Sequence, residues 1–158
     1  MRQPMLSHYL ADEEATKAFG ASLYQALASN DGAVIFLEGD LGAGKSCLAR
    51  GFLHAGGVRG PMRSPTYTLM ELYRLQHRFC LHLDLYRIAD PVELDQLGLR
   101  DYSQDQAIWL VEWPSRGDAF LPAPDVRIEL SVQGSGRRVN LHSRDEQLLD
   151  QLKTRVPL

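Results

Sequence analysis

This 158-residue chain has a small net charge, only two cysteines and no long apolar run. Each of these features excludes a class of protein. The formal net charge is only −3, so the chain as a whole is not a basic surface for binding nucleic acid. No wholly apolar run exceeds five residues, far short of the roughly 20 that cross a bilayer. Residues 1–8 also lack the apolar core of a secretion signal. We therefore expect a cytoplasmic protein that makes no membrane contact.

The two cysteines, Cys47 and Cys80, have neither the spacing of metal ligands nor that of a disulfide framework. We interpret both as reduced, small core residues. The chain is 44% apolar and 23% charged, which is ordinary for a globular protein, and its length predicts one domain over residues 1–158. His54, His77 and His82 share no metal-binding pattern and are interpreted as structural. Arg137 and Arg138 follow a Gly-Ser-Gly turn and are interpreted as solvated surface charge.

One segment is rich in glycine and carries a complete phosphate-binding pattern, G-x-x-x-x-G-K-[ST]. It follows an apolar run at residues 33–37, so it lies where a strand would turn into a helix. The glycines let backbone N–H groups turn toward phosphate oxygens, and the positive end of the next helix faces the same anion. The pattern predicts that ATP binds with Mg²⁺ at Gly39, Asp40, Leu41, Gly42, Ala43, Gly44, Lys45, Ser46 and the adjoining Cys47. Lys45 supplies charge for the outer phosphates, and the Ser46 hydroxyl is suited to binding Mg²⁺.

The remaining pattern alternates strands and helices. Helices are predicted after Asp12, from residue 45 to about residue 55, after Asp90, and weakly over residues 145–152. Strands are predicted at residues 33–37 and 107–111, both buried on two faces. Two antiparallel hairpins are predicted, over residues 68–83 and 126–142. This order favours an α/β fold: a three-layer P-loop NTPase with a mixed, mostly parallel central sheet, whose site lies at the carboxyl ends of the strands.

Two acids follow apolar strands and could serve the metal or the attacking water. Asp84 follows residues 79–83 in the layout of a Walker B element, and Glu112 follows residues 107–111. We predict both as catalytic and metal-binding residues, although Asp84 could instead cap a helix or pair with Arg87, and Glu112 could be a surface acid. Spacing leaves open which of them binds Mg²⁺ directly.

The segment Ser64-Pro65-Thr66-Tyr67-Thr68 follows the helix after the phosphate-binding loop. In nucleotide triphosphatases, switch segments reach back to the γ-phosphate and the metal from such a position. Its hydroxyl groups fit that task, and a hydroxyl-rich turn that enters a strand is the alternative.

Four motifs in order resemble the bacterial TsaE family, also called YjeE: the phosphate-binding loop, S-P-T-Y-T, D-L-Y-R at residues 84–87 and V-E-W-P at residues 111–114. The resemblance implies an ATPase that assists formation of threonylcarbamoyladenosine on tRNA, beside the anticodon. It implies TsaD and TsaB as protein partners, contact with tRNA through their complex, and ATP hydrolysis that resets the complex. By position it implies phosphate and Mg²⁺ binding by Lys45 and Ser46, a switch role for Thr66, and metal and water roles for Asp84 and Glu112.

Two other function classes remain. A nucleotide-gated binding module would use ATP binding alone to drive association, without essential hydrolysis. A small-molecule kinase would need an acceptor site, for which a chain of this length has little room. A guanine-specific switch is disfavoured because no Asn-Lys-x-Asp sequence occurs.

Overall fold

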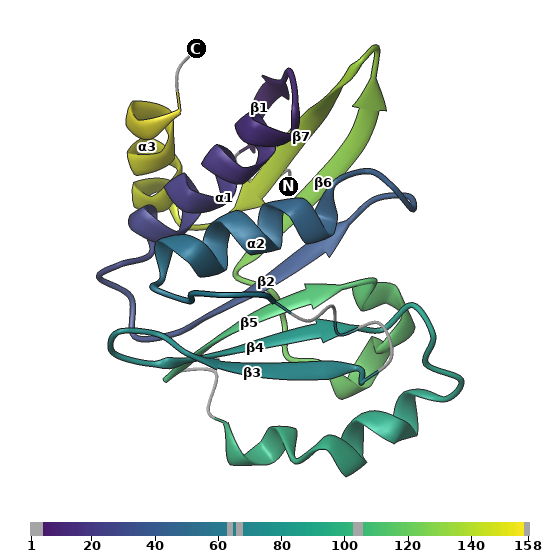
Figure 1. Cartoon of the computed structure of the whole chain (residues 1–158). Coiled ribbons are helices and arrows are strands. Elements are labelled where there is room, and N and C mark those ends of the chain that lie inside the picture. The colour runs from purple at the N-terminus through teal and green to yellow at the C-terminus, as the bar shows by residue number, and fades with distance from the viewer. Residues whose placement is uncertain (1–4, 63–64, 66–67, 103–105, 157–158) are drawn as a thin grey trace.

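The computed structural model describes residues 5–62, 65, 68–102 and 106–156 of the chain. Within that part, one sheet has the strand order β1-β7-β6-β2-β5-β4-β3 (Figure 1). The strands are β1 (Met5–Leu10), β2 (Ala33–Glu38), β3 (Met70–Arg74), β4 (Phe79–Asp84), β5 (Ala107–Glu112), β6 (Val126–Gln133) and β7 (Gly136–Ser143). Strands β1, β6, β2, β5 and β4 run in one direction, and only β7 and β3 run against them. The predicted mixed, mostly parallel α/β sheet is confirmed.

The middle of the sheet is parallel and buried on both faces. Strand β2 lies between β5 and β6 and pairs in parallel with each. Alternate β2 side chains enter different cores: Ile35 and Leu37 pack on one face, and Val34 and Phe36 on the other. A strand covered on both sides needs no polar alternation, which is why its sequence reads as one apolar run.

Three α-helices cover one face: α1 (Glu13–Ala26), α2 (Lys45–Ala55) and α3 (Glu146–Arg155) (Figure 1). Asp12 caps α1 by accepting a hydrogen bond from the Ala15 N–H at 2.8 Å, as its sequence position predicted. Helices α1 and α2 cross in close contact, because an added Cβ at Gly51 would lie 2.1 Å from the Lys17 carbonyl oxygen. This contact fixes α2, whose N-terminus adjoins the phosphate-binding loop.

The opposite face is covered by 3-10 turns, η1 (Pro91–Leu97), η2 (Leu99–Asp101), η3 (Pro114–Arg116) and η4 (Asp118–Phe120), in place of long helices. The predicted element after Asp90 begins where expected, with a capping box between Asp90 and Glu93. It is a 3-10 helix that ends at Gly98, which has φ 72°. Leu94 and Leu99 from these turns pack against the second face of the sheet.

The edges of the sheet are antiparallel. The two predicted hairpins form, β3 with β4 and β6 with β7. The sequence reading missed β1, which pairs with β7 so that Leu10 lies opposite Arg137. Its signal is a short alternation in which Leu6 and Leu10 are buried and the residues between them are more exposed. In the described residues, no helix is both long and apolar enough to cross a membrane.

Candidate functional site

The phosphate-binding loop connects β2 to α2 at the carboxyl edge of the parallel strands. Gly39, Gly42 and Gly44 have φ values of 147°, 79° and 108°, which glycine adopts readily. Gly39 is also packed tightly, because an added Cβ would lie 2.4 Å from the Leu130 carbonyl oxygen of β6. The loop therefore needs glycine at this position both for its backbone angle and for its contact with the neighbouring strand.

Lys45 begins α2, and its ammonium group turns back into the loop. Its Nζ donates hydrogen bonds to the carbonyl oxygens of Gly39 at 2.5 Å and Asp40 at 3.0 Å. The residue is only 5% exposed, and Nζ lies 4.4 Å from the centre of the Trp113 ring. Burial lowers the Lys45 pKa, and the negative charges of Glu112, Asp84 and Asp40 oppose that shift. The loop thus holds a desolvated cation in the place where the pattern predicts phosphate.

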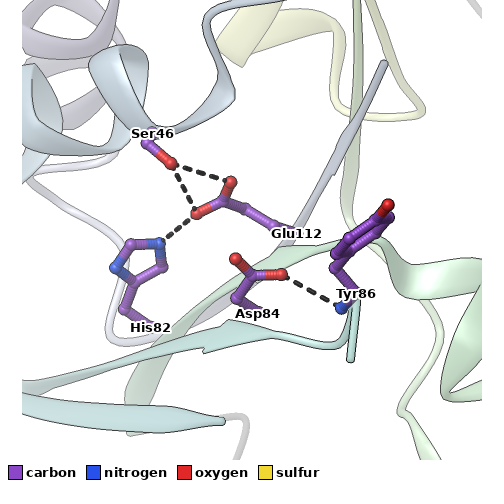
Figure 2. A network of polar contacts seen from close by, with 5 residues as sticks. All are labelled: Ser46, His82, Asp84, Tyr86 and Glu112. Atoms are coloured by element: carbon purple, nitrogen blue, oxygen red, sulfur yellow. Dashed lines mark hydrogen bonds and ion pairs between the residues drawn. The ribbon is translucent and has the colours of Figure 1, made fainter. Parts of the chain in front are cut away.

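Ser46, Glu112 and His82 form a polar network in which Glu112 and His82 are buried and Ser46 is partly exposed (Figure 2). The Ser46 hydroxyl lies 3.2 Å from Glu112 Oε1 and 3.5 Å from Oε2. His82 Nε2 lies 2.7 Å from Glu112 Oε2. Toward an ionised carboxylate, His82 can make this hydrogen bond only by donating an N–H from Nε2. Glu112 is 2% exposed, so this carboxylate is held in place by both partners and largely shielded from water.

Asp84 lies beside Glu112, because the two residues are partners in the parallel pairing of β4 with β5. Asp84 Oδ1 accepts a hydrogen bond from the Tyr86 N–H at 3.1 Å, in a turn rather than at a helix start, because the next helix, η1, is capped by Asp90. Asp84 is also buried and lines the same cavity as Ser46 and Glu112. Asp84 therefore fixes the turn after β4 and also lies at the site, and it does not cap a helix.

A cavity of about 270 Å³ unites these groups. It is lined by Leu41, Gly42, Gly44, Lys45, Ser46, Asp84, Tyr86, Glu112 and Trp113. Backbone N–H groups and an ammonium can bind anionic oxygens here, and the hydroxyl and carboxylates are the hard oxygen donors that Mg²⁺ prefers. Within the described residues, no group of three or more His, Cys, Asp or Glu side chains could hold a metal by itself. A magnesium ion here would therefore need oxygen atoms from a bound phosphate or from water.

The sequence profile of one protein family, described as Threonylcarbamoyl adenosine biosynthesis protein TsaE, matches residues 10–139, which include every residue of this cavity. The chain belongs to the TsaE family. Membership connects it with the biosynthesis of threonylcarbamoyladenosine.

Two TsaE relatives and one solved structure show the extent of the likeness. The chain is 39% identical over 139 residues to the tRNA threonylcarbamoyladenosine biosynthesis protein TsaE of Haemophilus influenzae, covering 86% of this chain and 88% of that protein. The protein of the same name from Bacillus subtilis is 38% identical over 125 residues, covering 79% and 77%. The crystal structure of B. subtilis YdiB matches with a TM-score of 0.79 at 28% identity, over 98% of this chain and 97% of that one. The likeness supports the P-loop NTPase-like fold predicted from the sequence.

The structure brings together most of the predicted TsaE site residues. Lys45, Ser46, Asp84 and Glu112 line one cavity. Thr66 lies outside the described residues, as do Ser64 and Tyr67, so the switch role stays a prediction. Cys47 is only partly buried, which corrects its interpretation as a core residue, and its Sγ lies 3.6 Å from the Glu13 carbonyl oxygen of α1.

Sequence reasoning did not identify His82 and Arg137 as residues that contact this TsaE site from outside the cavity lining. His82 was interpreted as structural, yet it contacts Glu112 directly. The signal was its place two residues before Asp84, because side chains at i and i+2 of a strand share a face. Arg137 was interpreted as solvated, yet its guanidinium reaches the phosphate-binding loop. No local sequence signal places Arg137 there, since the contact depends on how β7 lies in the sheet.

A larger cavity of about 640 Å³ lies at the opposite edge of the sheet, by the first residues of β4 and β5. It is lined partly by Arg74, Phe79 and Tyr102. Ligands of open α/β sheets bind at the carboxyl ends of the strands. We therefore take the smaller cavity as the candidate functional site of this TsaE protein, because it is lined by Lys45, Ser46, Asp84 and Glu112.

Proposed function

We propose that this protein is a cytoplasmic, Mg²⁺-dependent ATPase that assists TsaD and TsaB in threonylcarbamoylation of the adenosine beside the tRNA anticodon. Hydrolysis of ATP would reset that complex, and tRNA would contact this protein through the complex. The observation that carries the proposal is the placement of Ser46 and Glu112 within 3.2 Å of each other beside a loop that holds Lys45. A hydroxyl, a carboxylate and a buried ammonium at a helix N-terminus match the needs of phosphoryl transfer.

The described residues fit both ligands of that reaction. The loop offers backbone N–H groups at the start of α2, where an anion is stabilised by the helix. Ser46 and Glu112 offer two oxygen donors side by side. When bound there, Mg²⁺ would neutralise charge on the outer phosphates. Lys45 would exchange its hydrogen bonds with the Gly39 and Asp40 carbonyls for contacts with phosphate oxygens.

Glu112 would orient the attacking water and accept its proton. Its carboxylate is fixed before any ligand arrives, because His82 and Ser46 hold its two oxygens. A positioned base lowers the barrier only when it lies within hydrogen-bond reach of the proton that it removes. Asp84, next to Glu112 in the neighbouring strand, would add negative charge toward the metal.

The test is a reconstituted modification assay with this protein, TsaD, TsaB and tRNA, which compares ATP with a non-hydrolysable analogue. Hydrolysis that resets the complex requires many turnovers with ATP and about one with the analogue. Full multiple turnover with the analogue would instead support the nucleotide-gated binding module. Absence of Mg²⁺–ATP binding to the folded protein, alone and with the partners, would reject both.

A further inference from the structure

Arg137 connects strand β7 to the phosphate-binding loop. Its Nε donates to the Ala43 carbonyl oxygen at 3.1 Å, and its Nη2 donates to the Gly42 carbonyl oxygen at 3.0 Å. Its third nitrogen, Nη1, donates to the Gly136 carbonyl oxygen at 2.9 Å. The guanidinium is therefore held on its own strand while it binds two consecutive carbonyls of a loop more than 90 residues earlier in the chain.

The sheet explains how a distant residue arrives at this position. Strand β6 runs parallel to β2, so the end of β6 lies at the same edge as the loop that follows β2. The turn after Gln133 leads directly into β7, in which Arg137 pairs with Val132 on one side and with Leu10 on the other. Arg137 thus lies in a strand that is paired on both sides, so its backbone is held in place beside the loop.

Peptide planarity links these two bonds to phosphate binding. In a trans peptide the C=O and the next N–H point in opposite directions. The peptide that Arg137 holds through the Gly42 oxygen carries the Ala43 N–H, which donates to the Asp40 carbonyl at 3.0 Å and closes the turn of the loop. The peptide held through the Ala43 oxygen carries the Gly44 N–H. Fixing both carbonyls on one side fixes the direction of both N–H groups.

We infer that Arg137 is a positioning residue for nucleotide binding: it braces the apex of the phosphate-binding loop, so that the turn stays closed and the Gly44 N–H faces the phosphates before ATP arrives. The guanidinium also polarises both peptide units, because hydrogen bonds in a chain strengthen one another and those from a charged donor are the strong ones. The inference deepens the proposed function and rests on it. Arg137 holds the outer, carbonyl side of the loop, so it acts through the loop and makes no contact with ATP.

A brace of this kind acts equally on the bound substrate and on the transition state. Uniform binding of this kind changes affinity and leaves the rate of the bound complex unchanged. Removing hydrogen bonds from a charged donor predicts a Kd for Mg²⁺–ATP that rises about tenfold or more. The variant Arg137→Lys would keep the positive charge but lose the two-pronged geometry of the guanidinium, so R137K should recover only part of the affinity.

The experiment compares Arg137→Met with a matched control, Arg138→Met. Arg138 is the next residue on the same strand, yet it donates to the Gln133 side chain and stacks over Tyr9, away from the loop. Calorimetry with Mg²⁺–ATP should give R137M a Kd about tenfold or more above that of the parent protein. R138M should retain the parent Kd, and kcat at saturating ATP should be unchanged in both. A folded R137M whose Kd stays within twofold of the parent value would overturn the inference.

A second measurement on the nucleotide-free protein separates this inference from the proposed function. If Arg137 braces the loop, amide hydrogen exchange at Ala43 should be faster in R137M than in R138M, while exchange in α1 stays the same. Equal exchange at Ala43 in the two variants would refute the brace, even if the parent protein binds ATP. If exchange at Ala43 is faster in R137M than in R138M but the parent protein binds no Mg²⁺–ATP, the result would support the brace and reject the ATPase proposal.

Discussion

Replacing Glu112 with glutamine separates chemistry from folding at this site. The glutamine side chain matches the shape of glutamate, and its carbonyl oxygen can accept the His82 N–H while its amide donates to the Ser46 hydroxyl. Both contacts observed around Glu112 can therefore persist. What Glu112→Gln removes is the negative charge and the ability to accept a proton from water.

The magnitude follows from that loss. A positioned general base contributes about 10²–10⁴-fold to the rate, so kcat for ATP hydrolysis should fall by roughly 100-fold or more in E112Q. ATP affinity should change far less than kcat, because the loss of one carboxylate donor to Mg²⁺ is offset by the loss of its repulsion of the phosphates. Glu112→Ala also leaves the buried His82 N–H without its carboxylate partner, which costs about 1–3 kcal/mol of stability. E112A should therefore have a lower Tm, whereas E112Q should melt near the parent temperature.

The assay measures steady-state phosphate release with the modification partners present, together with Kd for Mg²⁺–ATP by calorimetry. A hydrolysis rate in E112Q within about threefold of the parent would refute the base assignment, because a lost base costs far more than that. Equal losses in Kd and kcat/KM, with kcat unchanged, would show that Glu112 serves ground-state binding.

Three further predictions concern the same region. Lys45→Ala should abolish ATP turnover, since the outer phosphates lose their buried cation; a folded K45A that still hydrolyses ATP would contradict this role. Gly39→Ala should lower the Tm and ATP affinity together, because its new Cβ would lie 2.4 Å from the Leu130 carbonyl oxygen, and calorimetry with thermal melting would detect both. Burial raises the pKa of both thiols, with Glu13 adding to the shift at Cys47, so both hold less reactive thiolate at pH about 7.4 than a free cysteine does. Alkylation mapped by mass spectrometry should be slow at the partly buried Cys47, should speed up as pH rises, and should reach Cys80 only on unfolding; rapid labelling of Cys80 in the folded protein would contradict its burial.

Local sequence rules predicted those parts of the fold whose causes are local. The Asp12 cap and the capping box from Asp90 to Glu93 depend on residues within four positions of each other, and both are present. The unbroken apolar run of β2 predicted a central strand, because burial on both faces is what such a run requires. Strand β1 was missed because it is stabilised by pairing with the edge of β7, a partner more than 120 residues away in the sequence.

In the candidate site, too, the residues with local sequence signals were predicted and the contacts between distant segments were not. The spacing of the loop identified Lys45 and Ser46, and the apolar strands before Asp84 and Glu112 placed both acids at one edge of the sheet. Sequence spacing left open which of the two acids would bind Mg²⁺ directly. The structure places Glu112 in hydrogen-bond contact with Ser46, while Asp84 caps the Tyr86 N–H. These contacts of Glu112 and Asp84 depend on where the ends of β5 and β4 lie relative to the start of α2. No local sequence pattern encodes that arrangement.

His82 and Arg137 show why a phosphate-binding loop needs the whole sheet. His82 reaches Glu112 from β4, on the side of the loop toward β3, and Arg137 reaches Gly42 and Ala43 from β7, on the other side. Each fixes a group that a ligand would contact, and each is itself anchored in a paired strand. Preorganised donors and charges cost no reorganisation when the reaction occurs, which is the condition under which electrostatic stabilisation is most effective. The strands on both sides of β2 therefore hold the backbone of the loop and its nearest carboxylate, which is the preorganisation that the proposed nucleotide binding requires.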